Sequence, residues 1–353
     1  MSKNILVAPL NWGLGHATRC IPIIRALEIE GFTPILASDG VALDILRKEF
    51  PQLQSIVLPY YHIEYPKNGV FFKLKMVANS PKMLAAMLSE KKLIKEIIKE
   101  HNISGIISDN RLGVRNKKIP SIFITHQLNV MTGNTTWLTS KMHQYIIKKY
   151  DECWVPDVNT IPNLTGKLGH LEENIKTVKY IGPLSRLHKK SLEKKYDLMV
   201  ILSGPEPQRT FLEEKLIVEL DNYVGKIIFI KGKIEVKQII ETRNNITFYN
   251  YMNSQELENS FNESEFILCR SGYTTVMDLA QLEKKAFFIP TPGQYEQEYL
   301  AKKYKKEGLV PYCKQEKFTV EKLLEVNLYK GLKDFNTKID WKSLFEIFEK
   351  TKK

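Results

Sequence analysis

The feature that most constrains the fold of this chain is a regular alternation of short apolar runs with longer stretches of helical periodicity. Helical stretches such as 17–30, 41–49 and 81–100 separate apolar runs of the buried-strand type. Parallel neighbouring strands need such crossover helices, so the order predicts an α/β fold with parallel sheets covered by helices on both faces. The expected strands are 5–10, 34–37, 55–58, 104–108, 121–125, 153–155, 198–202, 226–230, 247–249, 266–269, 287–289 and a short one near 309–310. The later helices are expected at 138–149, at 212–223, directly after Gly272, after Gln297 as far as Lys306, and at 320–327 and 341–350.

The alternation is interrupted once, between Ile181 and a lysine-rich run that ends at Lys195. A chain of 353 residues also exceeds what one hydrophobic core comfortably serves. We therefore expect two Rossmann-like domains, 1–183 and 184–353, with the last helix a candidate for packing back on the amino-terminal domain. Ligands of such folds bind outside the carboxyl ends of the strands, so we expect a central cleft there.

A turn of small residues follows the predicted strand 266–269. Arg270, Ser271 and Gly272 lead into a helix whose first N–H groups and positive dipole end suit an anionic phosphate group. Asp278 stands six residues after Gly272, where its carboxylate could accept hydrogen bonds from a ribose diol. An ordinary strand–helix connection with a solvated Asp278 fits the same local pattern, and both interpretations stay open.

The first strand is followed by a second glycine-containing turn. Gly13 and Gly15 permit positive φ and a close approach of a ligand, and His16 begins the next helix. A dinucleotide fingerprint is matched only weakly, because Thr18 stands where a third glycine would, and Asp39 is the only acid after the second strand. With an ordinary pKa near 6.5, His16 suits a general base; capping the turn or contacting a ligand oxygen are the alternatives.

The chain is basic, with 52 Lys and Arg against 40 Asp and Glu, a net charge of +12. This charge favours an acidic partner such as nucleotide phosphates, an anionic membrane surface or nucleic acid, unless it only reflects the composition of the host's proteins. The aromatic and lysine-containing stretch 65–76 and the lysines of the following helix suit docking on an anionic leaflet, or a solvated helix face. Those helix lysines are Lys82, Lys91, Lys92, Lys95 and Lys99.

The four cysteines lie far apart and make neither a metal cluster nor a disulfide framework, which predicts a reducing cytoplasm. The opening residues do not form a signal peptide, and no apolar run approaches the roughly 20 residues that span a bilayer. We therefore expect a cytoplasmic protein, with a peripheral position on the inner membrane as the open variant.

Four patches in a characteristic order resemble a known family. They are Gly15-His16; His126-Gln127-Leu128-Asn129 with Gly133; Ser203-Gly204-Pro205 to Arg209; and Arg270-Ser271-Gly272 with Thr275, Asp278 and Gln294 to Glu298. On these residues the chain resembles the GT-B glycosyltransferases, and most closely the family that includes the N-acetylglucosaminyltransferase forming lipid II in peptidoglycan synthesis. The patches extend over most of the chain.

The resemblance implies a nucleotide-sugar donor, most often UDP-linked, held by the carboxyl-terminal domain, and an acceptor held by the amino-terminal domain. Asp278 would bind the ribose, Tyr251 and Met252 would lie at the base, and Ser271 to Tyr273 would offer backbone to the diphosphate. The implied donor-binding residues are Ser203, Gly204, Arg209, Tyr251, Met252, Arg270, Ser271, Gly272, Tyr273, Thr275, Asp278, Gln294, Gln297 and Glu298; the acceptor-binding residues are Gly13, Gly15, His126 and Asn129.

The chain departs from the family at several of these positions. Gln127 replaces an acid and Leu128 an amide, and the sequence Pro205-Glu206-Pro207 interrupts the second glycine loop. Arg209 is a candidate to compensate there as a phosphate clamp. After the donor helix, Glu283-Lys284-Lys285 replaces the usual Gly-Leu-Pro.

The implied reaction is transfer of a hexose or N-acetylhexosamine to a hydroxyl of a lipid-linked or cell-envelope acceptor. Helix N-termini with Arg209 or Arg270 would stabilise the negative charge of the leaving diphosphate. No metal or cofactor is expected, because no Asp-x-Asp motif occurs. His16 is the first candidate for the general base and Asp109 the second, although Asp109 could instead serve in a turn.

Two other classes of protein stay open at this point. A nucleotide-sugar epimerase would need a cluster of carboxylates, for which the candidates are Asp109, Glu296 and Glu298. A non-catalytic protein that binds nucleic acid or another anionic ligand would use the positive charge, but the sequence contains no recognised nucleic-acid-binding module.

Overall fold

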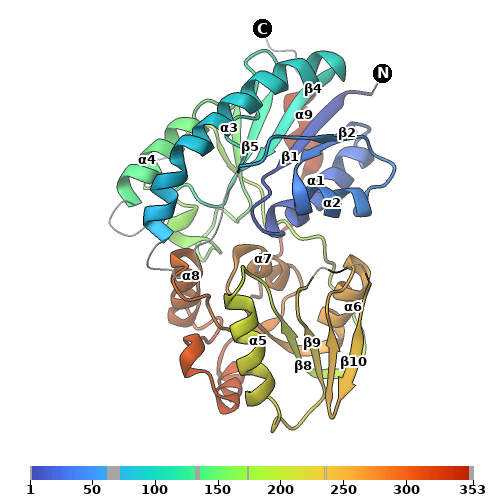
Figure 1. Ribbon diagram of the computed structural model, residues 1–353, viewed down its shortest axis with the longest axis vertical. Helices are drawn as coiled ribbons and strands as arrows, with labels where there is room; N and C mark the ends of the chain where they lie inside the picture. The colour runs from blue at the N-terminus through green and yellow to red at the C-terminus, as the bar shows by residue number, and fades with distance from the viewer. Residues whose placement is uncertain are drawn as a thin grey trace. The chain divides into compact units, whose positions relative to one another are not determined.

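The computed structural model describes residues 2–61, 72–131, 136–172, 175–233, 235 and 237–349, with the backbone alone for 72–84. Contacts within the chain separate two units, each of which is an α/β structure. The first runs to Arg186 and also contains the described residues from Thr337 onward, and the second covers Leu187–Asn336. The α/β class predicted from the sequence is confirmed (Figure 1).

The first unit is built on a seven-stranded parallel sheet with the order β3-β2-β1-β4-β5-β6-β7. Its strands are β1 (Asn4–Pro9), β2 (Thr33–Ser38), β3 (Ser55–Val57), β4 (Ile103–Asp109), β5 (Ser121–Ile124), β6 (Glu152–Val155) and β7 (Val178–Tyr180). Its helices are α1 (Gly15–Ile29), α2 (Gly40–Glu49), α3 (Phe72–Glu100), α4 (Thr136–Ile147), the 3-10 helix η3 (Gly166–Leu168) and α9 (Trp341–Glu349).

Successive side chains of β1 point to opposite faces of this sheet, and different helices cover them. Leu6 belongs to a core cluster with Ile94 and Ile97 of α3. On the other face, a Cβ built on Gly105 of β4 would meet the ring of Phe348 at 2.3 Å and Ile5 at 3.0 Å. Only glycine at position 105 therefore lets α9 lie this close to the sheet.

The second unit contains a six-stranded sheet with the order β10-β11-β9-β8-β12-β13, parallel except for the hairpin of β10 with β11. Its strands are β8 (Tyr196–Ile201), β9 (Ile227–Ile230), β10 (Ile240–Arg243), β11 (Ile246–Tyr249), β12 (Ser264–Cys269) and β13 (Lys285–Phe288). Its helices are α5 (Gln208–Glu219), α6 (Ser254–Glu263), α7 (Tyr273–Gln281), α8 (Tyr295–Lys306) and the 3-10 helices η4 (Gln315–Lys317) and η5 (Val320–Leu328).

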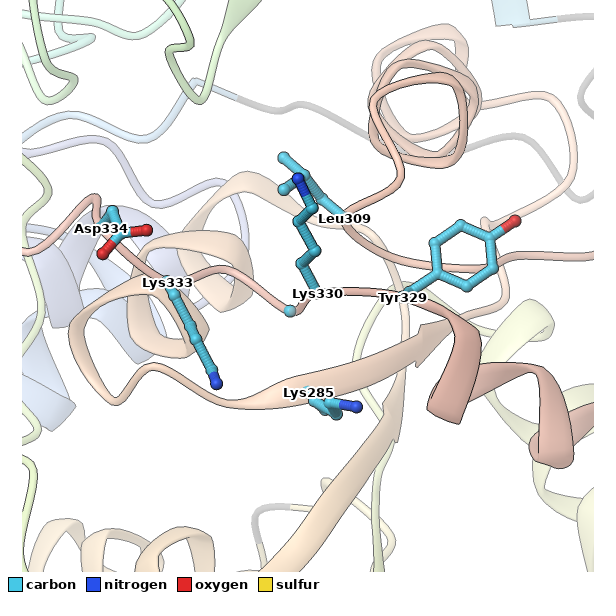
Figure 2. Close-up of a pocket in the computed structure, with 7 residues that line it drawn as sticks. Lys285, Leu309, Tyr329, Lys330, Lys333 and Asp334 are labelled. Carbon is cyan, nitrogen blue, oxygen red and sulfur yellow. The ribbon is translucent and has the colours of Figure 1, made fainter.

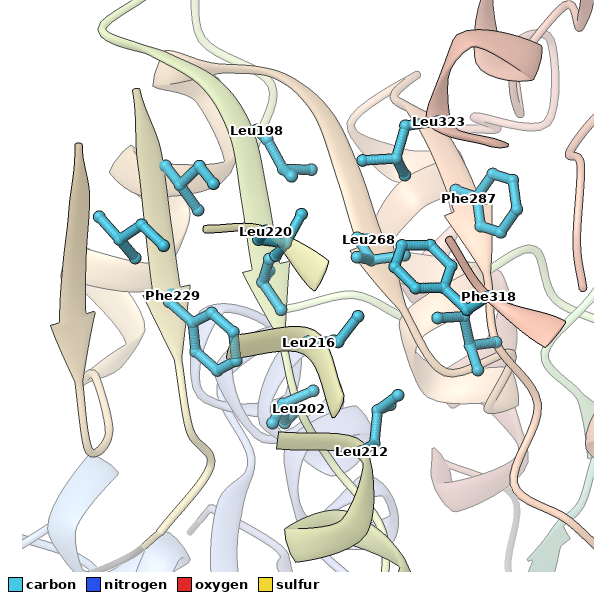
Figure 3. Close-up of a cluster of buried hydrophobic side chains, with 14 of the residues drawn as sticks. Leu198, Leu202, Leu212, Leu216, Leu220, Phe229, Leu268, Phe287, Phe318 and Leu323 are labelled. Carbon is cyan, nitrogen blue, oxygen red and sulfur yellow. The ribbon is translucent and has the colours of Figure 1, made fainter. Parts of the chain in front are cut away.

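One face of this sheet carries the hydrophobic cluster of Figure 3. Leu212, Leu216 and Leu220 recur every four residues, so they form one apolar stripe that packs α5 and its C-cap on the sheet. Phe318 and Leu323 cover the same face beside Phe287 of β13. Burying one such leucine stabilises the fold by about 1.5 to 3 kcal/mol.

The strand order reverses direction once in each sheet, between β1 and β4 in the first unit and between β8 and β12 in the second. At such a point the two following connections leave to opposite faces, which opens a crevice beyond the carboxyl ends of the strands. The turns at these four strand ends are the ones that the sequence singled out, at 11–16, 109–111, 203–209 and 270–273.

The elements differ from those predicted in several places. The predictions lacked strands β7 and β10 and helix α6. Residues 320–328 form a 3-10 helix. No strand is assigned at 309–310, where both N–H groups bond to the carbonyl oxygen of Tyr304, so this segment closes the end of α8. Among the described residues, no helix is long and apolar enough to cross a membrane.

Candidate active site

Four polar side chains meet where the strand order of the first unit reverses: His16, Arg19, Asp109 and His126. Asp109 is the last residue of β4, and His16 and Arg19 lie one turn apart on α1. His16 Nδ1 lies 2.8 Å from Asp109 Oδ1, and Arg19 Nε donates to Asp109 Oδ2 at 2.5 Å. Arg19 Nη2 donates to Asp109 Oδ1, and Arg19 Nη1 lies 3.0 Å from His126 Nδ1.

This cluster holds an ion pair away from water, with Arg19 2% and Asp109 0% exposed. Burial alone would raise the pKa of the Asp109 carboxyl, but Arg19 and His16 beside it hold that pKa well below its ordinary value. Burial lowers the pKa of His16, and the positive charge of Arg19 lowers it further. These two effects outweigh the raising effect of the Asp109 carboxylate, so the pKa of His16 lies below its ordinary value. At neutral pH the cluster therefore contains an ionised Asp109 and a neutral His16.

The proton positions follow from these charge states, by assignment from the hydrogen-bond network. An arginine can only donate, so His126 Nδ1 accepts from Arg19. The ionised Asp109 can only accept, so His16 Nδ1 carries the proton of that bond, and the nearby Arg19 Nη2 directs its hydrogen to Asp109. His16 Nε2 is left with a lone pair and no hydrogen-bond partner in the described part of the chain, on a side chain that is 12% exposed.

The other predicted acceptor residues flank this cluster. Gly13 has φ +75°, and a Cβ built there would meet nothing within 4 Å, so the turn needs glycine for its conformation and lies open. Gly15 is the first residue of α1. Asn129 instead braces backbone, because its Nδ2 donates to the Lys167 carbonyl at 2.7 Å. Gly133 lies outside the described residues.

A second buried network lies on the same unit and accounts for Asp39. Arg111 Nη1 donates to Asp39 Oδ1 at 2.6 Å, and Arg111 Nε donates to Glu90 Oε1 at 2.6 Å. Asn11 Nδ2 donates to Asp39 Oδ2 at 3.0 Å, which ties the glycine turn to α2. Asp39 is thus held by the fold itself.

Small residues and backbone groups form the corresponding region of the second unit. Ser203 and Gly204 follow β8, and Ser271 and Gly272 follow its neighbour β12. Gly204 has φ +103°, and a Cβ built on it would lie 3.7 Å from Thr291 Oγ1. The two turns therefore lie near the loop after β13, and they present no bulky side chain there.

Gln297 of α8 connects the turn after β12 with the loop after β13. Its Oε1 accepts from Thr291 N at 2.8 Å, and its backbone oxygen accepts from Ser271 Oγ at 2.8 Å. Its Nε2 donates to Gln294 Oε1 at 2.6 Å and would lie 4.0 Å from a Cβ on Gly272. Gln297 thus orders the turn, and the Thr291 hydroxyl oxygen is buried without a hydrogen-bond partner.

Two helices start at this edge of the sheet. The N-cap of α7 is Gly272 and that of α8 is Gln294, and neither provides a side-chain capping bond. Uncapped first-turn N–H groups and the positive dipole end attract an anion. Glu298 is committed locally, since its Oε1 accepts from Gly293 N at 3.1 Å.

Asp278 and Thr275 lie three residues apart on α7 and so share one side of the helix. Both are half-buried, whereas Tyr273 is buried with the apolar residues of the opposite side. Tyr273 can therefore offer its backbone, but its ring belongs to the core. Burial, with Asp278 nearby, raises the pKa of the Cys269 thiol, which stays protonated.

Arg270 is buried at 1% exposure and bonds neutral oxygens. Its Nη1 donates to the carbonyls of Ile289 and Pro290 at 3.1 and 3.2 Å, and its Nη2 donates to Gln208 O and Gln315 Oε1 at 2.8 Å each. Burial lowers its pKa to about 9. Within the described residues it makes no ion pair, so this positive charge has only dipoles around it.

Two other predicted donor residues, Arg209 and Met252, make side-chain contacts elsewhere in the unit. Arg209 pairs with Glu206 and Glu213 and donates to the Lys231 carbonyl at 2.9 Å, so it would have to leave Glu206 to clamp a phosphate. Tyr251 and Met252 follow β11, and the Met252 sulfur accepts from Ser260 Oγ at 3.4 Å.

A cavity of about 330 Å³ lies at the other end of β13 (Figure 2). Lys285, the first residue of that strand, lines it together with Lys330 and Lys333. Figure 2 shows the Lys330 side chain beside Leu309, while those of Lys333 and Lys285 point in other directions, so the three ammonium groups do not converge on one point. We do not assign this cavity to the reaction.

Arg19 is the main residue of the first site that was not predicted from the sequence. It occupies a position on the buried side of α1, three residues after His16, among apolar neighbours. A charged residue within an apolar helical stripe is a signal that could have found it. No group of three His, Cys, Asp or Glu side chains suited to a metal ion occurs among the described residues.

Comparison with solved structures identifies the fold. The glycotransferase of kitacinnamycin superimposes with a TM-score of 0.64 at 13% identity, covering 99% of this chain and 93% of the other. Acinetobacter baumannii MurG superimposes with a TM-score of 0.54 at 14% identity, covering 93% and 91%. The two-sheet fold is that of the GT-B class, as predicted. The sequence comparisons below make the chain a glycosyltransferase.

Sequence comparison narrows this class. Residues 206–339 match the model of the glycosyltransferase family 28 C-terminal domain. A relative from Glaesserella parasuis serovar 5 is 22% identical over 338 residues, 92% of this chain and 89% of the relative. That protein is named UDP-N-acetylglucosamine--N-acetylmuramyl-(pentapeptide) pyrophosphoryl-undecaprenol N-acetylglucosamine transferase. The epimerase and the non-catalytic binding protein receive no support from these comparisons.

Proposed function

We propose that the chain transfers N-acetylglucosamine from a UDP-linked donor to a hydroxyl group of a lipid-linked acceptor, without a metal ion. The observation that carries the proposal is the meeting of two small-residue turns and an uncapped helix start at the strand-order reversal of the second unit. The name of the Glaesserella parasuis relative supports the choice of sugar and acceptor.

In this proposal the second unit binds the diphosphate of the donor mainly through backbone groups of its turns. The first-turn N–H groups of α7 after Gly272 and the turn at Ser203 and Gly204 receive the diphosphate. Asp278 accepts hydrogen bonds from the ribose hydroxyls, one helical stretch further on. The buried charge of Arg270 adds a favourable field for the diphosphate as negative charge develops on it during transfer.

The first unit supplies the base. His16 Nε2 takes the proton of the acceptor hydroxyl, and Asp109 stabilises the imidazolium that forms. The acceptor oxygen bonds to the anomeric carbon while the bond from that carbon to the phosphate oxygen breaks, and its electron pair leaves with UDP. Because Asp109 accepts from Nδ1, it is a positioning residue that keeps the lone pair on Nε2.

A lipid-linked acceptor places the enzyme at the cytoplasmic face of a membrane as a peripheral protein. The basic charge of +12 supports contact with an anionic surface. Of the stretch 65–76 that was predicted to dock there, residues 65–71 lie outside the described residues. For residues 72–76 the structure describes the backbone alone.

Release of UDP tests the proposal directly. Purified enzyme is incubated with UDP-N-acetylglucosamine with and without a lipid-linked acceptor, and free UDP and the glycosylated lipid are measured together. We expect both products only when the acceptor is present. Conversion of the donor to another UDP-sugar would instead indicate an epimerase, and the absence of UDP binding by calorimetry would contradict the donor site itself.

A further inference from the structure

Thr291 carries a buried hydroxyl group that has no role in the proposed reaction. It lies in the loop after β13 and is 2% exposed, and its Oγ1 has no hydrogen-bond partner among the described residues. Burying a hydroxyl without a partner is unfavourable, so most such groups in folded proteins are bonded. The Thr291 hydroxyl therefore needs a partner that the described part of the chain does not supply.

The backbone of the loop holds this hydroxyl in place. Thr291 N donates to Gln297 Oε1 at 2.8 Å, and the Thr291 carbonyl oxygen accepts from Gln294 N at 3.1 Å. Both backbone groups of Thr291 are thus bonded to the segment that begins α8, and the side chain alone is left to meet a ligand. Because threonine is branched at Cβ, it has few rotamers, and the direction of its hydroxyl group is fixed before a ligand binds.

The hydroxyl lies beside the glycine turn that follows β8. A Cβ built on Gly204 would have Thr291 Oγ1 at 3.7 Å and no other described atom within 4 Å outside its chain neighbours. At Gly272, after β12, the only such atom is Gln297 Nε2 at 4.0 Å. Both turns therefore leave room for a ligand, and the side-chain atom nearest to each turn can donate a hydrogen bond.

The groups around Thr291 favour a ligand that is anionic. Arg270 Nη1 donates to the carbonyl oxygens of the two residues that precede Thr291, at 3.1 and 3.2 Å. The helix starts at Gly272 and Gln294 add N–H groups that no side chain caps. The Glu298 carboxylate already accepts from the backbone of this loop. A phosphate oxygen, which only accepts hydrogen bonds and carries negative charge, suits these surroundings better than a sugar hydroxyl does.

We propose that the Thr291 hydroxyl donates a hydrogen bond to a non-bridging oxygen of the diphosphate of the bound donor. This inference deepens the proposed function and rests on it for the identity of the ligand. Thr291 binds the diphosphate through its side chain, whereas the turns at Gly204 and Gly272 bind it through backbone groups. A hydrogen bond to a charged oxygen is stronger than one between neutral groups, so its loss lowers the affinity measurably.

Two variants of the full chain separate the hydroxyl group from the size of the side chain. Thr291→Val replaces the hydroxyl by a methyl group, and Thr291→Ser keeps the hydroxyl. Calorimetry measures UDP directly and uridine by displacement of UDP. We expect Thr291→Val to bind UDP about 10-fold more weakly than the wild type, and Thr291→Ser to stay within about threefold. Both variants should bind uridine as the wild type does, because uridine lacks the diphosphate.

The melting temperature of the free enzyme distinguishes ligand binding from a structural role. Thr291→Val should melt no lower than the wild type, because the hydroxyl that it removes bonds nothing in the described chain. The matched control is Thr165→Val in the first unit, where the hydroxyl is also buried but donates to Asp157 Oδ2. This control should melt lower than the wild type and bind UDP equally well.

Equal UDP affinity of Thr291→Val and the wild type would overturn the inference and leave the donor site in place. A loss that is the same for UDP and uridine, a loss that is the same in Thr291→Val and Thr291→Ser, or a lower melting temperature of Thr291→Val would also overturn it, because each indicates packing. Transfer from UDP-N-acetylglucosamine is assayed on the same proteins. A wild type that shows the expected UDP affinities but transfers no sugar would uphold the role of Thr291 and reject the proposed reaction. A wild type that binds no UDP would overturn both.

Discussion

The two units place different chemistry at the equivalent point of their sheets. In the first, charged and titratable side chains fill the end of β1 and β4, with Arg19 and Asp109 as a buried ion pair beside His16. In the second, the ends of β8 and β12 carry glycine, serine and backbone groups, and Arg270 has only neutral partners. The buried ion pair of the first unit determines which nitrogen of His16 carries the proton. The backbone N–H dipoles of the second unit can instead bind an anionic ligand.

The largest expected effect comes from removing His16, the proposed base, and it tests whether proton transfer and donor binding belong to different units. His16→Ala should lower turnover by about 10² to 10⁴-fold, because it removes the base that is proposed to take the acceptor proton. The affinity for UDP, measured by calorimetry, should stay within about twofold. His101→Gln serves as a control on a histidine of the same unit. A parallel loss of UDP affinity in His16→Ala would break the division between the two units.

The buried ion pair predicts an unequal response to the loss of an arginine. Arg19→Met should lower the free energy of unfolding by about 3 to 5 kcal/mol, because it leaves the Asp109 carboxylate buried without its partner. Arg270→Met removes a charge that has no carboxylate to leave behind and should be less harmful. Urea denaturation followed by circular dichroism compares them.

The double variant Arg19→Met with Asp109→Leu sharpens this test. It removes both charges and should recover most of the stability that Arg19→Met loses. A double variant as unstable as Arg19→Met would show that packing, rather than the unpaired carboxylate, sets the effect.

The strand and helix alternation was enough to predict the parallel sheets, because buried strands are apolar throughout and helices keep their period. The strand β10 escaped prediction since all four of its residues are exposed and its sequence Ile-Glu-Thr-Arg lacks a buried pattern. Helix α6 carries a capping box of Asn253 and Glu256, a local signal that could have revealed it.

The candidate sites were predictable only in part. The turns at Gly15 and Gly272 could be found, because glycine and a following helix are local features. The pairing of Arg19 with Asp109, 90 positions apart, and the bridging of Thr291 by Gln297 depend on packing that no local pattern encodes. For the same reason the sequence suggested Arg209 as a free clamp, although Glu206 and Glu213 hold it in the folded unit.

Acid should act on the first unit through its buried histidines. Burial lowers the pKa of His143 to about 4, while in the unfolded chain it lies near 6.5, so the unfolded state binds more protons between these values. The stability that comes from neutral His143 is complete above about pH 6.5 and falls by up to about 1.4 kcal/mol per pH unit toward pH 4.

The variant His143→Phe isolates this contribution. Urea titrations between pH 7 and 4.5 should give a shallower loss of stability than in the wild type, with His188→Gln as the control in the second unit. Identical slopes for His143→Phe and the wild type would contradict the assignment of a buried neutral histidine.

The smallest expected effect is that of a chelator. If main-chain dipoles and Arg270 meet the charge of the leaving diphosphate, turnover should stay within about twofold after dialysis against EDTA. Loss of activity that Mg²⁺ or Mn²⁺ restores would show that the second unit needs a cation at its neutral site.

The most direct test of the account concerns Asp278 and the ribose. Calorimetry should compare UDP and 2′-deoxy-UDP on the wild type and on Asp278→Ala. We predict that the wild type binds UDP about 10-fold more tightly than the deoxy analogue, and that Asp278→Ala weakens UDP and removes this difference. An unchanged UDP affinity in Asp278→Ala, or an equal preference for UDP in both proteins, would contradict the donor site described for the second unit.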